Sequence, residues 1–324
     1  MDIALNLAWV IFGLAGLYYG AEWLVRGAAG TALSAGISTL VVGLTVVAFG
    51  TSMPELIVSI EANLTGSGDF ALGNVIGSNI CNIGLVLAIA ALMTPIVAHK
   101  QILRGELPLL IIVSLVFIAM LLYDNQIGRI EGLGLALGVV LYTFACIQIA
   151  KRNPESPIAA IEGEVDELSE ESKKIGSNLL LIVVGLIVLA LGAKGLVVGG
   201  EFLATKLGVS KAVIALTLIA FGTSLPELAT TVVACRKGET ELAVGNAIGS
   251  CLFNLMCVVG FTALIKPIAS TAIAIEDLAI MTAYPVVTFL LLKHNPTLGR
   301  VGGIILLVPY IAYSVYLVVF RGVQ

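Results

Sequence analysis

The sequence predicts an all-α polytopic membrane protein, in which ten transmembrane helices form two inverted five-helix repeats with broken helices 2 and 7. Two observations carry this fold class. Of the 324 residues, 59% are hydrophobic and only 12% are charged, whereas charged residues make up about a quarter of a soluble domain. Two sequence motifs of the first half of the chain also recur in the second half, in one ungapped register.

The apolar residues are gathered into ten runs, each long enough to cross a bilayer as a helix of roughly 20 residues. We expect these spans at 5–25, 37–62, 71–93, 107–123, 131–150, 178–199, 209–234, 242–265, 277–292 and 299–320. The runs are long and continuous and lack the alternation of apolar and polar residues that marks a transmembrane β-barrel strand. A helical bundle is therefore predicted.

The internal repeat has a fixed register of 172 residues. TVVAFGTSMPEL (45–56) aligns with TLIAFGTSLPEL (217–228), and GNVIGSNICN (73–82) aligns with GNAIGSCLFN (245–254). From Leu44 to Leu56 only three of thirteen positions differ from their counterparts. We refer to residues at matching positions of the two halves as repeat mates.

The topology follows from the number of spans in each half. Five is odd, so the second repeat enters the membrane upside down relative to the first, a plan typical of secondary transporters with a site near the bilayer midplane. We expect repeats at 1–150 and 178–324, with motif regions 45–82 and 217–254, joined by an acidic linker at 151–177. Placing both termini outside puts eleven of the 17 Lys and Arg residues on the cytoplasmic side, as the positive-inside rule favours.

The linker is the longest polar stretch of the chain. It holds six carboxylates between Glu162 and Glu171 but lacks the glycine-centred twelve-residue loop of a calcium-sensing hand. We interpret it as a solvated cytoplasmic segment.

Each repeat carries a proline and a carboxylate in the middle of an apolar run. Pro54 and Pro226 have no N–H, so each interrupts helical hydrogen bonding, and the preceding glycine of each motif adds backbone freedom. Glu55 and Glu227 follow directly, and a carboxylate at this depth costs roughly 2.5–3.5 kcal/mol on insertion scales. Such residues usually face the bundle interior and mark an ion or substrate path. The alternative for one copy is a proline kink with a structural glutamate.

The span after each broken helix supplies further oxygen atoms. Asn74, Ser78 and Asn82 recur every four residues and form one polar stripe, and their mates repeat it. Interhelical polar contacts are the structural alternative. Carboxylates, hydroxyls and amide oxygens together suit a hard cation, above all calcium, which takes six to eight flexible oxygen ligands. The five cysteines show no metal-ligand spacing.

These motifs resemble the paired alpha repeats of the sodium/calcium exchanger family, and the resemblance to its short prokaryotic members covers essentially the whole chain. It implies that Glu55 and Glu227 are the central acidic ligands shared by calcium and sodium. It also implies a set of hydroxyl, amide and backbone ligands at Thr51, Ser52, Thr223, Ser224, Ala48, Ala220, Ser78, Asn82, Ser250 and Asn254. Some members carry aspartate where this chain has Asn254, and the amide here argues against potassium dependence.

The sequence therefore predicts a calcium/sodium antiporter of the cell membrane, electrogenic and potassium-independent, working by alternating access. We expect calcium and sodium as transported ions, the lipid bilayer as surroundings, no cofactor, no catalytic residue and no nucleic-acid partner; a monomer suffices for the pathway. The alternatives are a proton/calcium antiporter, a cation channel and, from another class, an intramembrane aspartyl protease. GSGD (66–69) and Tyr123-Asp124 suggest the last, but they come in the wrong order and leave the duplication unexplained.

Overall fold

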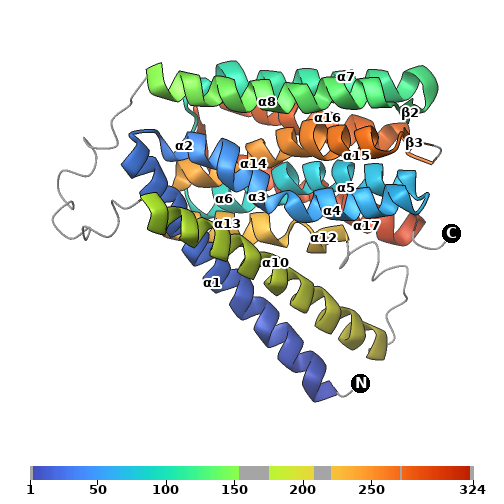
Figure 1. Ribbon diagram of the computed structural model, residues 1–324, viewed down its shortest axis with the longest axis horizontal. Coiled ribbons are helices and arrows are strands. Elements are labelled where there is room, and N and C mark those ends of the chain that lie inside the picture. Colours follow the sequence, from blue (N-terminus) through green and yellow to red (C-terminus); the bar gives the residue numbers. More distant parts are fainter. Residues whose placement is uncertain (1–2, 153–174, 208–219, 271, 322–324) are drawn as a thin grey trace. The chain divides into compact units, whose positions relative to one another are not determined.

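The computed structural model describes residues 3–152, 175–207, 220–270 and 272–321 (Figure 1). Within these ranges the chain is almost entirely helical. Nine helices are long and apolar enough to span a membrane: Ile3–Ala35, Thr39–Leu64, Gly68–Met93, Ile102–Asp124, Arg129–Ala150, Ile175–Lys206, Thr240–Ile265, Ile275–His294 and Arg300–Val319. Each coincides with a predicted span. The first part of the predicted span 209–234 and most of the linker 151–177 lie outside the described residues.

Several spans consist of successive helical segments. The segments of the first repeat are α1 (Ile3–Ala35), α2 (Thr39–Val42), η1 (Gly43–Val47), α3 (Ala48–Thr51), α4 (Met53–Leu64), α5 (Gly68–Cys81), η2 (Asn82–Leu87), α6 (Ala88–Met93), η3 (Ile102–Glu106), α7 (Leu107–Asp124) and α8 (Arg129–Arg152). Those of the second repeat are α10 (Ile175–Lys206), α12 (Ala220–Gly222), α13 (Leu225–Arg236), α14 (Thr240–Phe253), η7 (Asn254–Val258), α15 (Val259–Ile265), α16 (Ile275–His294), α17 (Arg300–Tyr316) and η8 (Leu317–Arg321). The η segments are π-helical turns.

The chain divides into two compact units, and each unit contains residues from both sequence repeats. Unit 1 comprises residues 1–51 and 143–246, and unit 2 comprises residues 52–142 and 247–324. The compact units therefore do not coincide with the two repeats at 1–150 and 178–324, which remain a division predicted from sequence alone.

Unit 1 is built on the close packing of α1 against α10, which lie side by side in Figure 1. A β-carbon built on Gly13 would lie 2.8 Å from the carbonyl oxygen of Gly192, and one built on its mate, Gly185, would lie 2.8 Å from the carbonyl oxygen of Gly20. The helices run antiparallel, since Gly27 faces Asn178 near the opposite end. Small residues let membrane helices approach this closely, and the antiparallel pairing of mates agrees with an inverted repeat.

Unit 2 shows the same symmetry in two short strand ladders. β1 (Ile96–Val97) pairs with β4 (Thr297–Leu298), and β2 (Gln126–Ile127) pairs with β3 (Ile268–Ala269), both antiparallel. β1 and β3 are mates, so each ladder joins a strand of one repeat to a strand of the other. The two ladders are therefore equivalent under the symmetry that relates the two repeats.

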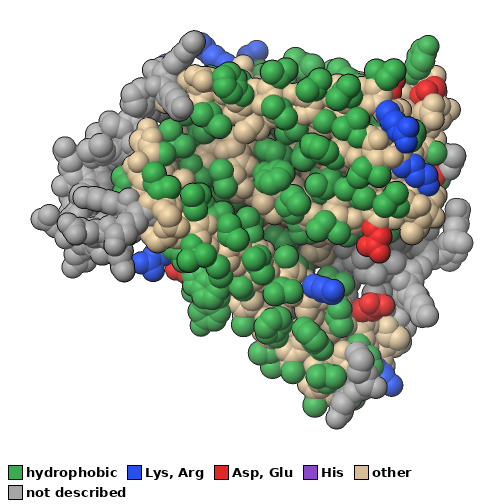
Figure 2. Space-filling model, viewed as in Figure 1, with side chains coloured by type: hydrophobic (Ala, Val, Ile, Leu, Met, Phe, Trp, Pro, Cys, Tyr) green, Lys and Arg blue, Asp and Glu red, His purple; other side chains and the backbone are tan. Residues whose placement is uncertain are grey.

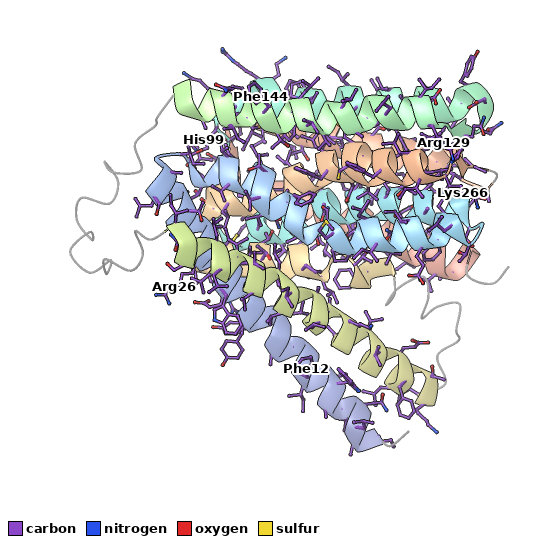
Figure 3. All side chains as sticks on the ribbon, viewed as in Figure 1. Phe12, Arg26, His99, Arg129, Phe144 and Lys266 are labelled. Atoms are coloured by element: carbon purple, nitrogen blue, oxygen red, sulfur yellow. The ribbon has the colours of Figure 1, made fainter. Side chains whose placement is uncertain are left out.

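The outer surfaces of the helices are apolar. Ile130 is 84% exposed on α8, and Val301 is 73% exposed on α17. Figure 2 shows hydrophobic side chains over much of the visible face, with few charged groups among them, and Phe12 of α1, labelled in Figure 3, is 49% exposed. Large exposed apolar surfaces of this kind are those that membrane lipids cover.

Candidate functional site

Helix 2 is broken at Ser52, as the sequence predicts. The α3 segment ends at Thr51, Ser52 has φ −82° and ψ 2°, and α4 begins at Met53 with Pro54 in its first turn. Helical hydrogen bonding resumes where the Leu56 N–H donates to the Ser52 carbonyl at 3.2 Å. Glu55 lies in this first turn and is completely buried, where the positive end of the helix dipole favours a carboxylate.

Helix 7 is broken in the same way at Ser224. The α12 segment ends at Gly222, Ser224 has φ −89° and ψ 4°, and α13 begins at Leu225 with Pro226 in its first turn. Glu227 is completely buried in that turn. The two breaks thus share one backbone geometry, which confirms the prediction drawn from the repeated proline motif.

In unit 2 the polar stripe of α5 faces Glu55. The Asn74 Nδ2 donates to the Glu55 carbonyl oxygen at 3.3 Å and to the Ser59 hydroxyl at 3.0 Å. One turn further along, the Ser78 hydroxyl donates to Glu55 Oε1 at 3.4 Å. The stripe therefore holds both the backbone and the carboxylate of Glu55.

In unit 1 Asn246, the mate of Asn74, holds Glu227 in the corresponding way. Its Nδ2 donates to the Glu227 carbonyl oxygen and to the Thr231 hydroxyl, each at 3.3 Å. Its Oδ1 accepts a hydrogen bond from the Thr51 hydroxyl at 3.1 Å. Asn246 thereby joins the broken helix 7 to the end of α3, which comes from the other repeat.

The twelve residues expected to bind cations are divided equally between the units. Unit 1 contains Ala48, Thr51, Ala220, Thr223, Ser224 and Glu227, and unit 2 contains Ser52, Glu55, Ser78, Asn82, Ser250 and Asn254. Of these, Thr223 is half-buried, only the backbone of Ala220 is described, and the other ten are buried. The structure links Glu55 to Ser78 within unit 2 and links Thr51 through Asn246 to the backbone of Glu227 within unit 1.

Uncharged oxygen atoms dominate both groups. The described residues contain no cluster of three or more His, Cys, Asp or Glu side chains able to hold a metal ion. Any bound cation would therefore be coordinated mainly by hydroxyl, amide and carbonyl oxygens around few carboxylates. That chemistry suits sodium and calcium better than transition metals, which prefer imidazole or thiolate.

Two π-helical turns begin at candidate ligands and were not predicted from the sequence. η2 begins at Asn82 and η7 begins at its mate Asn254. In η7 the Val259 N–H donates to the Asn254 carbonyl, five residues earlier. Such turns are frequent at functional sites. The sequence patterns predicted regular helices here, because one wider turn leaves the apolar character of a span unchanged.

A second symmetric pair of buried acids was also missed. Glu106 is 4% exposed and accepts a hydrogen bond from Gln101 Nε2 at 2.9 Å; Asp277 is 9% exposed and accepts one from the Tyr313 hydroxyl at 2.8 Å. The buried positions of α7 recur in α16 at a spacing of 171 residues, as Leu107 and Leu278 show. The ungapped register of 172 does not align the two acids, and a one-residue gap would have revealed them.

The architecture and these polar groups define a class of protein, a polytopic helical membrane protein with two broken, carboxylate-bearing helices. Comparison with known proteins identifies the family within this class. Residues 5–148 and 177–319 match the family model described as sodium/calcium exchanger protein. The chain belongs to the sodium/calcium exchanger family.

The chain is also similar to individual known proteins over nearly its whole length. The chain is 37% identical to the inner membrane protein YrbG of Escherichia coli over 93% of both chains. It is 28% identical to the sodium/calcium exchanger MaX1 of Methanosarcina acetivorans, over 97% of this chain and 99% of that protein. Among solved structures, the sodium-calcium exchanger NCX_Mj superposes with a TM-score of 0.82 at 28% identity, covering 99% of this chain and all of that one.

Proposed function

We propose that this protein is an antiporter that exchanges calcium for sodium across the cell membrane by alternating access. The observation that carries the proposal is the symmetric pair of completely buried glutamates, each in the first turn after a helix break and each held by an asparagine of the following helix. Family membership supports the same conclusion. No catalytic residue and no cofactor is assigned, because the ions are the cargo.

We further propose that Glu55 and Glu227 serve one cation site near the bilayer midplane, together with the ten hydroxyl, amide and backbone ligands named above. Support comes from the inverted repeat, which in other transporters places a site where the repeats meet. Two carboxylates match the charge of one calcium ion, and the surrounding neutral oxygens supply the six to eight ligands that calcium takes.

Obligatory exchange follows from the electrostatics of such a site. An empty site would hold two carboxylates away from water, and the effective penalty for burying an unpaired ion is several kcal/mol. Calcium or several sodium ions would neutralise the carboxylates and compete for the same oxygens. If only a neutralised site changes its access, loaded carriers cross and empty ones do not, so one ion is exchanged for the other.

The membrane arrangement is part of the proposal. We place both termini outside and the 151–177 linker in the cytoplasm, on the distribution of Lys and Arg residues. We also propose that transport is electrogenic and independent of potassium, and the uncharged amide of Asn254 among the expected ligands supports the second point. An uptake rate that responds to an imposed membrane voltage but not to added potassium would support both points.

The test is calcium-45 uptake into sodium-loaded proteoliposomes. We expect wild-type protein to accumulate calcium only with an outward sodium gradient, and Glu55→Gln and Glu227→Gln each to abolish uptake. Glu61→Gln is the matched control, because Glu61 lies on the same helix as Glu55 but is exposed. Undiminished exchange in either glutamine variant would refute the proposal.

Two further measurements separate the alternatives. Uptake driven by a proton gradient without sodium would indicate a proton/calcium antiporter, and calcium flux without any counter-ion would indicate a channel. Equilibrium binding tests the single site: we expect one calcium per chain, lost entirely in either glutamine variant. Two independent sites would instead leave half of the binding intact.

A further inference from the structure

Asn82 and Asn254 are repeat mates and both are completely buried, but their side-chain amides differ in hydrogen bonding. The Asn254 Nδ2 donates to Asn79 Oδ1 at 3.1 Å. For Asn82, neither Nδ2 nor Oδ1 has a hydrogen-bond partner among the residues that the structure describes. A buried amide is normally hydrogen-bonded, so this difference between equivalent positions calls for a physical cause.

The cause is the residue that stands three positions earlier in each repeat. Asn79 precedes Asn82, and its mate Cys251 precedes Asn254. The two mates contact each other: Asn79 Nδ2 donates to the Cys251 carbonyl oxygen at 3.3 Å, and Cys251 Sγ donates to the Asn79 carbonyl oxygen at 3.7 Å. Their reciprocal contact marks where the symmetry axis of the repeat passes between α5 and α14 within unit 2. Asn79 therefore reaches across the axis to Asn254, whereas the Cys251 side chain carries no oxygen or nitrogen to offer Asn82.

The direction of each amide in this chain is fixed by a backbone group. The Cys251 carbonyl can only accept, so the atom of Asn79 that faces it must be Nδ2. This leaves Asn79 Oδ1 directed at Asn254, and Oδ1 can only accept, so Asn254 must present its own Nδ2. The Asn254 Oδ1 is then held away from Asn79, and no described residue donates a hydrogen bond to it.

We propose that Asn79 is a positioning residue. Its hydrogen bond with Asn254, which we call the brace, holds Asn254 Oδ1 in place as a cation ligand before the ion binds. Asn82 has no such brace, because Cys251 stands at the position equivalent to Asn79, so the cation itself must order Asn82. The inference rests on the proposed function, because it takes both asparagines as ligands of the transported ion. Ligands held in place by neighbouring hydrogen bonds bind more tightly, since less conformational entropy is lost on binding. The two repeats thus contribute unequal ligands despite their matching sequence.

The test is a pair of double-mutant cycles on calcium affinity, measured as the half-saturating calcium concentration for uptake into sodium-loaded proteoliposomes. We expect Asn79→Leu, which keeps the side-chain size but removes the brace, to raise this concentration about fivefold, the equivalent of one net hydrogen bond. On an Asn254→Ala background, where the braced ligand is already gone, the same change should add less than about twofold. On an Asn82→Ala background it should retain its full effect.

The asymmetry between the two cycles distinguishes a positioning role from a merely structural one. Coupling to Asn82 as strong as that to Asn254, or no coupling to either, would overturn the inference. Asn79→Ala serves as a second truncation should the leucine variant fail to fold.

The same cycles can be measured without transport, from the calcium-induced rise in unfolding temperature of detergent-solubilised protein. If Asn79 couples to Asn254 but not to Asn82 in this assay, and the protein shows no sodium-driven uptake, then the exchange function is refuted and the positioning role of Asn79 is supported. If the protein exchanges calcium for sodium but the effects of the Asn79 and Asn254 substitutions are additive, only the positioning role of Asn79 is refuted. A wild-type protein that neither exchanges ions nor responds to calcium would refute both the exchange function and the positioning role.

Discussion

Removing the side-chain amide of Asn246 should destabilise unit 1 by an amount that the structure allows us to work out. Asn246→Ala deletes two hydrogen bonds donated by Nδ2, to the Glu227 carbonyl and the Thr231 hydroxyl, and one accepted by Oδ1 from Thr51. A buried hydrogen bond contributes about 0.5–1.5 kcal/mol net. Thr51 keeps the Val47 carbonyl as a second acceptor at 3.1 Å, so its share is the smallest. We expect a total loss of about 2–3 kcal/mol.

The five buried cysteines provide the assay. Cys81, Cys146, Cys235, Cys251 and Cys257 all carry buried thiols that form no disulfide, so a fluorogenic thiol reagent reacts only as the protein unfolds. At about 2 °C per kcal/mol for a chain of this size, Asn246→Ala should lower the unfolding temperature by about 4–6 °C.

Asn246→Asp is the matched variant. It keeps an oxygen for Thr51 but loses both donors, and it adds a carboxylate near the backbone of Glu227. We expect it to unfold at a lower temperature than the alanine variant, because a buried unpaired charge costs more than a missing hydrogen bond. An unfolding temperature within 1 °C of wild type for both variants, on the scale set by these hydrogen bonds, would refute the reasoning.

Three further predictions use the same thermal assay. A β-carbon on Gly20 would lie 2.7 Å from a backbone nitrogen of α10, so Gly20→Ala should destabilise the protein by about 1–3 kcal/mol. A β-carbon on Gly134 would meet no atom within 4 Å beyond the adjoining backbone of its own helix, so Gly134→Ala should be neutral or stabilising by up to about 1 kcal/mol. Burial and the neighbouring Glu241 raise the pKa of Glu239 above its ordinary value of 4.5. The folded state therefore loses stability as the pH rises past 4.5 and through the raised pKa. We expect Glu239→Gln to unfold at a higher temperature than wild type at pH 7.5, and we expect this difference to disappear below pH 4.5. The Lys266 ammonium, labelled in Figure 3, donates a hydrogen bond to the Asn63 carbonyl at the C-terminal end of α4 at 2.9 Å. Lys266→Met removes this cap of the helix and should cost about 1 kcal/mol of stability. An unchanged unfolding temperature would show that the cap contributes nothing.

The broad organisation of the molecule could be predicted because its signals are local. Nine of the ten predicted spans coincide with apolar helices of the described residues, since burial in lipid depends on composition over some 20 residues. The breaks at Ser52 and Ser224 could also be predicted, because a proline without an N–H interrupts a helix wherever it lies. The proline and glutamate motifs stand out without any knowledge of neighbouring helices.

The partners of the site residues could not be predicted in the same way. The sequence placed Asn74, Ser78 and Asn82 on one stripe but gave no means of telling that Ser78 reaches the Glu55 carboxylate while Asn82 lacks a described hydrogen-bond partner. Such contacts join side chains on separate helices, and their geometry depends on how closely the helices pack. The one-residue shift that aligns Glu106 with Asp277 likewise became visible only through the repeated burial pattern of α7 and α16.

By itself, the sequence determined the membrane class, the inverted duplication, the positions of the helix breaks and the family to which the chain is similar, because each of these depends on residue types at fixed spacing along one chain. The tertiary structure alone decided which strand pairs with which, where the π-helical turns begin, and which of two equivalent asparagines is braced. The physical reason is that a hydrogen bond between helices requires two atoms within about 3.5 Å in a favourable orientation. Two repeats of matching sequence can meet that condition differently when one side chain, Cys251 in place of asparagine, lacks the necessary atom.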